Sequence, residues 1–532
     1  MKEGRRMRRL AVATIWLVLA AAAAPLPAQE PQREAPPRAA PSGEGAGPRR
    51  GAERPPEGRR LPADSVTQHT LELPGRSLRF TATAGALPLV DQQGALQAEI
   101  GYVAYTFEGT DPATRPVTFV VNGGPGASSA YLHLLALGPW RLPLDGAAIS
   151  PSTPPSLVPN AETWLDFTDL VFIDPVDTGY SRATGSGDDI RNRYFTVDGD
   201  IATLSAAVAR WLRANGRLAS PKFFAGESYG GFRGPRLAQQ LQNDIGVGLS
   251  GLVLISPVLD FAWMNQPRHA PWVHVARLPS YAAAALEERG PVTREALREA
   301  EDYAAGDYLV DLTRGLRDPE AVERVSRRVA ALTGLDPDLV RRRAGRVDMG
   351  TFQREFQRRS RRVVSAYDTG IGAADPDPTA AAPQAEDPAL SAMTAPLTSA
   401  IVDHLWRTLN WKVPDQRYHL LNGAVSGNWR WGQGRGQPES LTALRQALAL
   451  DGNLRVLVVH GFTDLVTPYF ASQLLLDQLP EDLAKRATLQ VYPGGHMYYS
   501  RDGSRQAFRD EAVKLYRAAL DSRGREPVPK PL

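Results

Sequence analysis

A serine lies between two glycines in the segment GESYG, residues 226–230. The segment follows the apolar run KFFA and precedes GPRLAQQLQND, which has helical spacing. A tight strand-to-helix turn exposes a serine hydroxyl, and it needs glycines beside the serine because it leaves no room for side chains. The G-x-S-x-G pattern alone is a weak signal, but this context favours Ser228 as a nucleophile over an ordinary turn serine.

A serine hydroxyl needs a base to take its proton and an acid to hold that base in the correct tautomer. In a strand-turn-helix site the order along the chain is Ser, then Asp or Glu, then His. Asp464 follows the apolar run LRVLVVHG, and His496 lies in the glycine-flanked loop YPGGHMYYS. We therefore predict that Ser228, Asp464 and His496 form a catalytic triad. For Asp464 the alternative is a helix N-cap or turn aspartate. We interpret His460, which lies in the apolar run before Asp464, as a buried structural histidine.

The segment NGGPG, residues 122–126, ends another apolar run early in the chain. Acyl transfer requires N–H donors aimed at the oxyanion that forms during the reaction. In hydrolases of this kind one donor comes from such an early loop and the other from the residue after the nucleophile. We predict Gly124 and Tyr229 as these two donors. A phosphate-binding loop is the rival interpretation, but the segment lacks the Lys-Ser/Thr ending of that motif.

A sheet must bring these distant loops together. Apolar runs bounded by turn residues are typical of strands buried on both faces of a parallel sheet, and they occur here as PVTFVVNGG, DLVFIDP, KFFAGES, GLVLISP and LRVLVVHG. From Val66, short runs separated by glycine and proline predict antiparallel strands at the edge of the sheet. The roughly 190 residues before LRVLVVHG show helical spacing, which predicts a helical insertion over the face where strands end.

The termini and the composition divide the chain further. Residues 1–28 are typical of a secretory signal peptide, because basic residues precede a short apolar run, although an uncleaved membrane anchor is the rival. Residues 29–62 have the composition of a disordered tether rich in Pro, Gly and Arg. The other expected parts are a first core part (63–262), a helical insertion or cap (263–419), a second core part (420–525) and a tail (526–532). We therefore expect an exported protein, periplasmic or extracellular, with no stable membrane insertion after signal cleavage.

The 532 residues include no cysteine and carry a net charge of +3. A chain without cysteine has no disulfide, no thiolate nucleophile and no cysteine-bound metal. The basic residues are dispersed rather than gathered into a block, which argues against binding to nucleic acid. We predict no cofactor and no metal.

Five blocks stand in the order found in the serine carboxypeptidase family, the S10 peptidases: VNGGPGASS, FTDLVFIDPVDTGYSR, GESYGG, GFTDLVTP and GGHM. From about Arg79 onward the chain resembles that family. The resemblance implies an α/β-hydrolase fold, with a mostly parallel central sheet, helices on both faces and a helical cap. It also implies a serine-type carboxypeptidase that releases C-terminal amino acids from peptides with a free C-terminus.

The resemblance further implies that Asn122, Gly123 and Glu227 hold the carboxylate of the substrate. Glu227 must then be protonated, because an ionised glutamate would repel that carboxylate. The alternative for Glu227 is a salt-bridged structural residue.

The chain departs from the eukaryotic members at several positions. Val120 and Ala127 replace a tryptophan and a cysteine, and Ala136 replaces a second glutamate that would share a proton with Glu227. Asp177 stands where the family has glycine. With its lack of cysteine the chain is more similar to the bacterial branch. Two alternatives remain open, namely an esterase or acyltransferase with the same triad, and a non-catalytic binding protein on the same scaffold.

Overall fold

The computed structural model describes residues 60–143, 150–152, 154–185, 187–264, 266–380, 386–432 and 436–521. They belong to one compact unit within Pro55–Leu532. The predicted signal peptide, most of the predicted tether and the tail 526–532 lie outside the described residues. Within the described ranges, no helix combines the length and the apolar character that crossing a bilayer requires.

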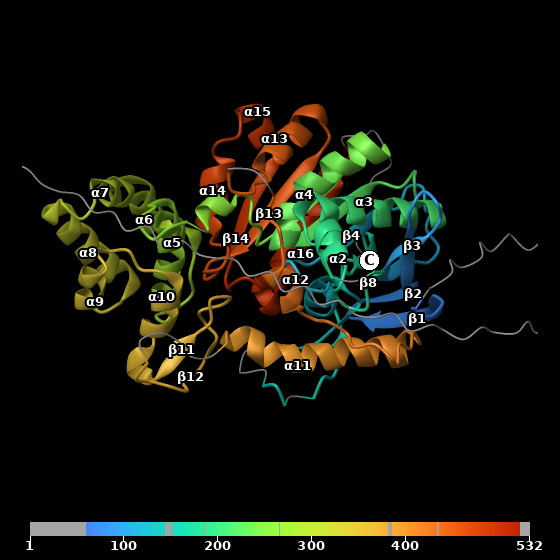
Figure 1. The fold of residues 1–532 in the computed structure, drawn as a ribbon, viewed down its shortest axis with the longest axis horizontal. Helices are drawn as coiled ribbons and strands as arrows, with labels where there is room; N and C mark the ends of the chain where they lie inside the picture. The colour runs from blue at the N-terminus through green and yellow to red at the C-terminus, as the bar shows by residue number, and fades with distance from the viewer. Residues whose placement is uncertain are drawn as a thin grey trace, which may run out of the picture. The chain divides into compact units, whose positions relative to one another are not determined.

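A ten-stranded sheet runs through this unit (Figure 1). Its path is β1 (Ser65–Leu73), β2 (Arg76–Val90), β3 (Leu96–Phe107), β7 (Asp169–Ile173), β4 (Val117–Val121), β9 (Lys222–Glu227), β10 (Gly251–Ile255), β13 (Arg455–Gly461) and β14 (Ala487–Tyr492), with β8 (Arg182–Ala183) beside β3. Strands β1, β2, β3 and β7 pair antiparallel, whereas every pair from β7 to β14 is parallel. The predicted antiparallel edge and the parallel centre are confirmed.

Alternate side chains of a strand point to opposite faces of a sheet, and in this sheet both faces are covered. In β4, Val120 belongs to one hydrophobic core, and Phe119 and Val121 belong to another. Side chains in the first core come from α1 (Ala130–Leu132), α11 (Pro388–Asp403) and α16 (Asp502–Asp521). Those in the second come from α2 (Asp188–Tyr194), α3 (Val197–Ala214), α4 (Tyr229–Gln240), α12 (Gly423–Gly427), α13 (Leu441–Leu450) and α14 (Tyr469–Leu476). The short α15 (Glu481–Ala484) precedes β14.

The segment between β10 and β13 is mainly helical, as predicted. A third hydrophobic core joins α5 (Trp272–Glu287), α6 (Arg294–Tyr303), α7 (Leu309–Arg314), α8 (Pro319–Thr333), α9 (Pro337–Arg342) and α10 (Met349–Glu355). This core includes Phe462, Leu465 and Tyr469, which follow β13, and α5 contacts α14 (Figure 1). The insertion therefore packs on the loop in which the acid was predicted.

Two small sheets were not predicted. One pairs β5 (Trp140–Arg141) with β6 (Val158–Pro159), and the other pairs β11 (Arg362–Val364) with β12 (Gly372–Ala374) inside the insertion. The β11–β12 pair brackets residues 365–371, and this connection reaches the candidate site.

Candidate active site

Ser228 lies on the turn between β9 and α4, with φ 60° and ψ −120°. Residues other than glycine rarely adopt a positive φ, and such strain is typically kept where function requires it. The flanking glycines are required by space. A Cβ on Gly226 would lie 2.2 Å from the carbonyl oxygen of Gly230, and one on Gly230 would lie 2.4 Å from that of Val121. The turn thus holds Ser228 partly exposed above a closely packed strand and helix.

Asp464 follows β13, His496 follows β14, and the two side chains meet. Nδ1 of His496 lies 2.8 Å from Oδ2 of Asp464. The carboxylate is fully buried and also accepts hydrogen bonds from the amides of Val466 and Thr467 and from the Thr467 hydroxyl. Because the carboxylate accepts the Nδ1 proton, Nε2 of His496 is left as the free acceptor.

That free nitrogen faces the nucleophile turn. Nε2 of His496 lies 3.9 Å from Oε1 of Glu227, the residue directly before Ser228. The main chain of His496 is tied to the same region, because the Ser256 hydroxyl donates to its carbonyl oxygen at 2.8 Å and Ser228 N donates to the neighbouring Ile255 O. Among the described residues Ser228 Oγ makes no hydrogen bond. Catalytic hydrogen bonds often tighten only when substrate is bound.

The surroundings of His496 set its pKa. Burial lowers the pKa, but the charge and hydrogen bond of Asp464, followed by the charges of Glu227 and Asp387, outweigh burial and raise it above its usual value. The ring of Tyr367 stands edge-on to the imidazole, with centroids 5.2 Å apart. This environment stabilises the imidazolium that a general base forms when it takes a proton.

The connection 365–371 of the insertion fastens both loops. The amide of His496 donates to the carbonyl oxygen of Tyr367 at 2.5 Å, and that of Leu465 donates to the oxygen of Ala366 at 2.9 Å. These contacts were not predicted, because SAYDTGI carries no motif and main-chain contacts leave no sequence signal. The insertion therefore positions both loops as well as covering them.

Glu227 is buried beside the turn and accepts two hydrogen bonds. Nδ2 of Asn122 lies 2.9 Å from its Oε2, and the hydroxyl of Tyr499 lies 2.6 Å from the same oxygen. Burial raises the pKa of Glu227, and although His496, Tyr499 and Asn122 oppose that effect, the pKa remains above its usual value. The sequence predicted that Asn122 and Glu227 act together, but it did not identify Tyr499. Tyr499 lies three residues after His496, where the sequence following GGHM carries no motif.

The NGG segment runs directly alongside the nucleophile turn. A Cβ on Gly123 would lie 2.6 Å from the carbonyl oxygen of Glu227 and 2.7 Å from the amide nitrogen of Tyr229. Within the described residues, neither Gly124 N nor Tyr229 N donates to a protein acceptor. Unpaired amides of this kind are suited to an oxyanion.

A buried ion pair holds the NGG segment in place. Arg233 on α4 is paired with Asp200 at 2.7 Å and donates to the carbonyl oxygen of Asn122. Its guanidinium lies 4.6 Å from the centre of the Tyr229 ring. A single side chain thus links Asn122 with the helix that begins at Tyr229.

The structure also places the residues at which the chain departs from the family pattern. Asp177 has φ 58°, a value that glycine adopts freely and aspartate tolerates, and its carbonyl oxygen accepts a hydrogen bond from Asn422 at 2.9 Å. Ala136 is buried in η1 (His133–Leu137), which packs against η7 (Tyr498–Ser500). His460 is buried, with Nε2 2.8 Å from the Ser472 hydroxyl, and burial lowers its pKa to about 4.

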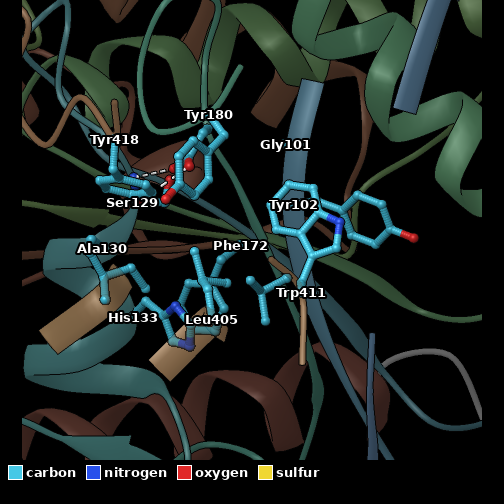
Figure 2. Close-up of a pocket in the computed structure, with 13 residues that line it drawn as sticks. Gly101, Tyr102, Ser129, Ala130, His133, Phe172, Tyr180, Leu405, Trp411 and Tyr418 are labelled. Carbon is cyan, nitrogen blue, oxygen red and sulfur yellow. Dashed lines mark hydrogen bonds between the residues drawn. The ribbon is translucent and has the colours of Figure 1, made fainter. Parts of the chain in front are cut away.

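A small cavity is lined by residues such as Ser129, His133, Tyr180 and Tyr418 (Figure 2). Its volume of about 20 Å³ has room for roughly one water molecule. Asp174 lies at its wall, accepting from Ser129 N at 2.8 Å, and burial raises its pKa to about 6. The cavity contains none of the predicted site residues, and its size excludes a peptide.

The chain was compared with protein families and with known proteins. The family model Peptidase_S10, serine carboxypeptidase, matches residues 78–286. Serine carboxypeptidase-like 33 of Arabidopsis thaliana is 30% identical over 165 residues, covering 29% of this chain and 32% of the relative. Pheromone-processing carboxypeptidase KEX1 of Yarrowia lipolytica is 33% identical over 144 residues, covering 26% of this chain and 21% of the relative. The matched segments thus span less than half the length of these plant and fungal relatives.

The fold is similar to that of a solved structure. The crystal structure of a prohormone-processing carboxypeptidase from Saccharomyces cerevisiae superposes with a TM-score of 0.51 at 15% identity, covering 82% of this chain and 91% of that chain. At this identity the likeness establishes the fold, which is the α/β-hydrolase fold predicted from the sequence. The match to the serine carboxypeptidase model is limited to residues 78–286, and over that segment the chain is similar to peptidase S10.

Proposed function

We propose that this chain is a serine carboxypeptidase that releases C-terminal amino acids from peptides through an acyl-enzyme on Ser228. The observation that carries the proposal is the 2.8 Å hydrogen bond from His496 Nδ1 to Asp464, which leaves Nε2 free on the side of the Glu227–Ser228 turn.

The residues then act in two stages. His496 Nε2 takes the proton of Ser228 Oγ as that oxygen attacks the last peptide carbonyl, and the amides of Gly124 and Tyr229 stabilise the oxyanion. His496 next gives the proton to the leaving amine. Water then attacks the acyl-enzyme with His496 again as base, which frees the shortened peptide and restores Ser228.

Specificity for a free C-terminus is assigned to Asn122, Gly123 and Glu227. In its neutral form Glu227 donates a hydrogen bond to the substrate carboxylate, and its raised pKa favours that form. The salt-bridge alternative for Glu227 has less support, because within the described residues its ion-pair partner is His496 and no lysine or arginine pairs with it.

The test is Ser228→Ala, with release of C-terminal amino acids followed by mass spectrometry. We expect a loss of about 10⁶-fold in kcat, whereas Ser250→Ala, which removes a buried hydroxyl without a hydrogen-bond partner, keeps the activity. A fluorophosphonate should label the wild type and not Ser228→Ala. Amino-acid release by Ser228→Ala at the wild-type rate would refute the mechanism, and preference for an ester over the free acid would favour an esterase.

We also propose that the chain is exported and belongs to a bacterial-type branch. Basic residues precede the apolar run Leu10–Ala24, and the chain lacks cysteine. Sequencing the N-terminus of protein recovered outside the cytoplasm should give Gln29 first. Full-length protein confined to the cytoplasm would refute export, and grouping with eukaryotic members in a phylogenetic tree would refute the branch.

A further inference from the structure

Both hydrogen bonds to Glu227 reach the same oxygen. Asn122 Nδ2 and the Tyr499 hydroxyl contact Oε2, at 2.9 and 2.6 Å, whereas among the described residues Oε1 accepts no hydrogen bond. The neighbours thus distinguish two oxygens that are equivalent in a free carboxyl group.

The direction of both hydrogen bonds is set by the partners. The Asn122 amide is oriented because its Oδ1 accepts from the amide of Leu132 at 3.0 Å, so Nδ2 is the atom that faces Glu227. The Tyr499 hydroxyl has one hydrogen-bond partner among the described residues, which is Glu227, so its proton points there. Oε2 therefore accepts two donors and has no position left for a proton of its own.

When Glu227 is neutral, the acid proton then lies on Oε1. This oxygen is 3.9 Å from Nε2 of His496, the predicted catalytic base. Building on the proposed function, we propose that Tyr499 is a positioning residue that keeps the proton of Glu227 on Oε1, from which it is donated to the carboxylate of the substrate.

Among the described residues Glu227 is hydrogen-bonded to the Tyr499 hydroxyl and not to a second carboxyl group. Tyr499 lies on η7, which packs against η1 with the small Ala136. Burial raises the pKa of Tyr499 well above its ordinary value, so the phenol stays protonated wherever Glu227 titrates. A second carboxyl group would share a proton with Glu227 and make the pair titrate in two steps. The phenol of Tyr499 stays protonated and therefore does not share a titrating proton with Glu227 in this way.

Other groups near Glu227 influence its charge but do not select an oxygen. The titratable groups that act on it from the packed elements are His496, Asp464, Tyr131, Tyr367, Tyr498 and Tyr499. Tyr498 is fully buried like Tyr499, yet its hydroxyl has no hydrogen-bond partner among the described residues. Tyr498→Phe is therefore a matched control for loss of a buried phenol.

The experiment compares Tyr499→Phe, Tyr498→Phe and wild type with a peptide that has a free C-terminus and with the same peptide as its methyl ester. For Tyr499→Phe we expect KM for the free acid to rise about fivefold to tenfold, with kcat and the KM for the ester within about twofold of wild type. The pH at which KM for the free acid begins to rise should move upward, because the variant lacks a donor that stabilises ionised Glu227. Tyr498→Phe should match wild type.

Glu227→Gln separates positioning from charge, since an amide does not titrate in this range. In this background, KM for the free acid should be independent of pH, and addition of Tyr499→Phe should shift no pH profile. The inference would be overturned if Tyr499→Phe changed KM equally for the acid and the ester, or if Tyr498→Phe and Tyr499→Phe behaved alike. It would also be overturned if the pH dependence of KM in Tyr499→Phe were that of the wild type. If the wild type shows no preference for the free acid over the ester, both the proposed function and this inference fail. If the wild type has that preference and Tyr499→Phe behaves like the wild type, only the inference fails.

Discussion

Replacing His404 by glutamine is expected to make the stability of the fold less sensitive to acid. The hydroxyl of Tyr105 lies between two buried imidazoles, 2.7 Å from Nε2 of His133 and 2.9 Å from Nε2 of His404. One hydroxyl donates to one ring and accepts from the other, so at least the ring that accepts the hydroxyl proton must be neutral. Burial, followed by the nearby charge of His69, lowers the pKa of His404 to about 3.

The size of the effect follows from proton linkage. In the unfolded chain His404 titrates at its ordinary pKa of 6.5, whereas in the fold it titrates at about 3. As pH falls below 6.5, the unfolded state binds a proton that the folded state does not, so stability is lost progressively until the folded pKa is reached. Each pH unit in that window costs about 1.4 kcal/mol, which gives about 2 kcal/mol between pH 7 and pH 5.

Urea unfolding at pH 7 and pH 5 measures this difference for wild type, His404→Gln and His269→Gln. His269 is exposed and controls for the removal of an imidazole. The loss of unfolding free energy between the two pH values should be about 2 kcal/mol smaller in His404→Gln than in wild type, and unchanged in His269→Gln. An equal acid-induced loss in His404→Gln and wild type would refute the reasoning, whatever the absolute stability of the variant.

Two further substitutions test the candidate site. Asp464→Asn removes the charge that opposes the burial of His496 and replaces an acceptor of its Nδ1 proton with an amide, so we expect kcat for peptide hydrolysis to fall about 10⁴-fold with little change in KM. A loss below about tenfold would contradict the role of Asp464. Gly226→Ala places a Cβ 2.2 Å from the Gly230 carbonyl oxygen, so activity and the urea midpoint should both fall, whereas Gly248→Ala, where a Cβ meets open space, should change neither. Wild-type activity in Gly226→Ala would show that the turn has room to adjust.

The parallel strands and the meeting of Asp464 with His496 were predictable because they follow from local patterns. Continuous apolar runs predicted the parallel strands, and active-site loops follow the carboxyl ends of such strands. Asp464 and His496 were expected to meet because they follow Ser228 in the order of a serine triad. The strands that precede them, β13 and β14, are neighbours in the sheet. The glycines at 226 and 230 were identified by the same reasoning, and their contacts explain why larger residues do not fit.

Contacts made by residues outside the sequence motifs were not predictable. Tyr499 and Glu227 are 272 positions apart, and no spacing connects a tyrosine after the histidine block with the glutamate before the nucleophile. The connection that contains Tyr367 carries no motif, and it meets the histidine loop through main-chain atoms that any residue supplies. The positive φ of Asp177 is likewise set by its surroundings. The sequence alone therefore did not explain why aspartate replaces glycine at this position.

The pKa shifts of the site residues affect the pH dependence of activity, and that of the buried His404 affects the pH dependence of fold stability. If Glu227 holds the substrate carboxylate as proposed, binding weakens as pH rises through its pKa, while proton transfer to His496 weakens as pH falls through its own. Both pKa values are raised, that of Glu227 by burial and that of His496 by Asp464 against burial. Both limits of activity therefore move to higher pH than the same groups would set in water. Since His404 makes the fold less stable as pH falls below 6.5, this upward shift moves both limits of activity away from the acidic range in which the fold loses stability.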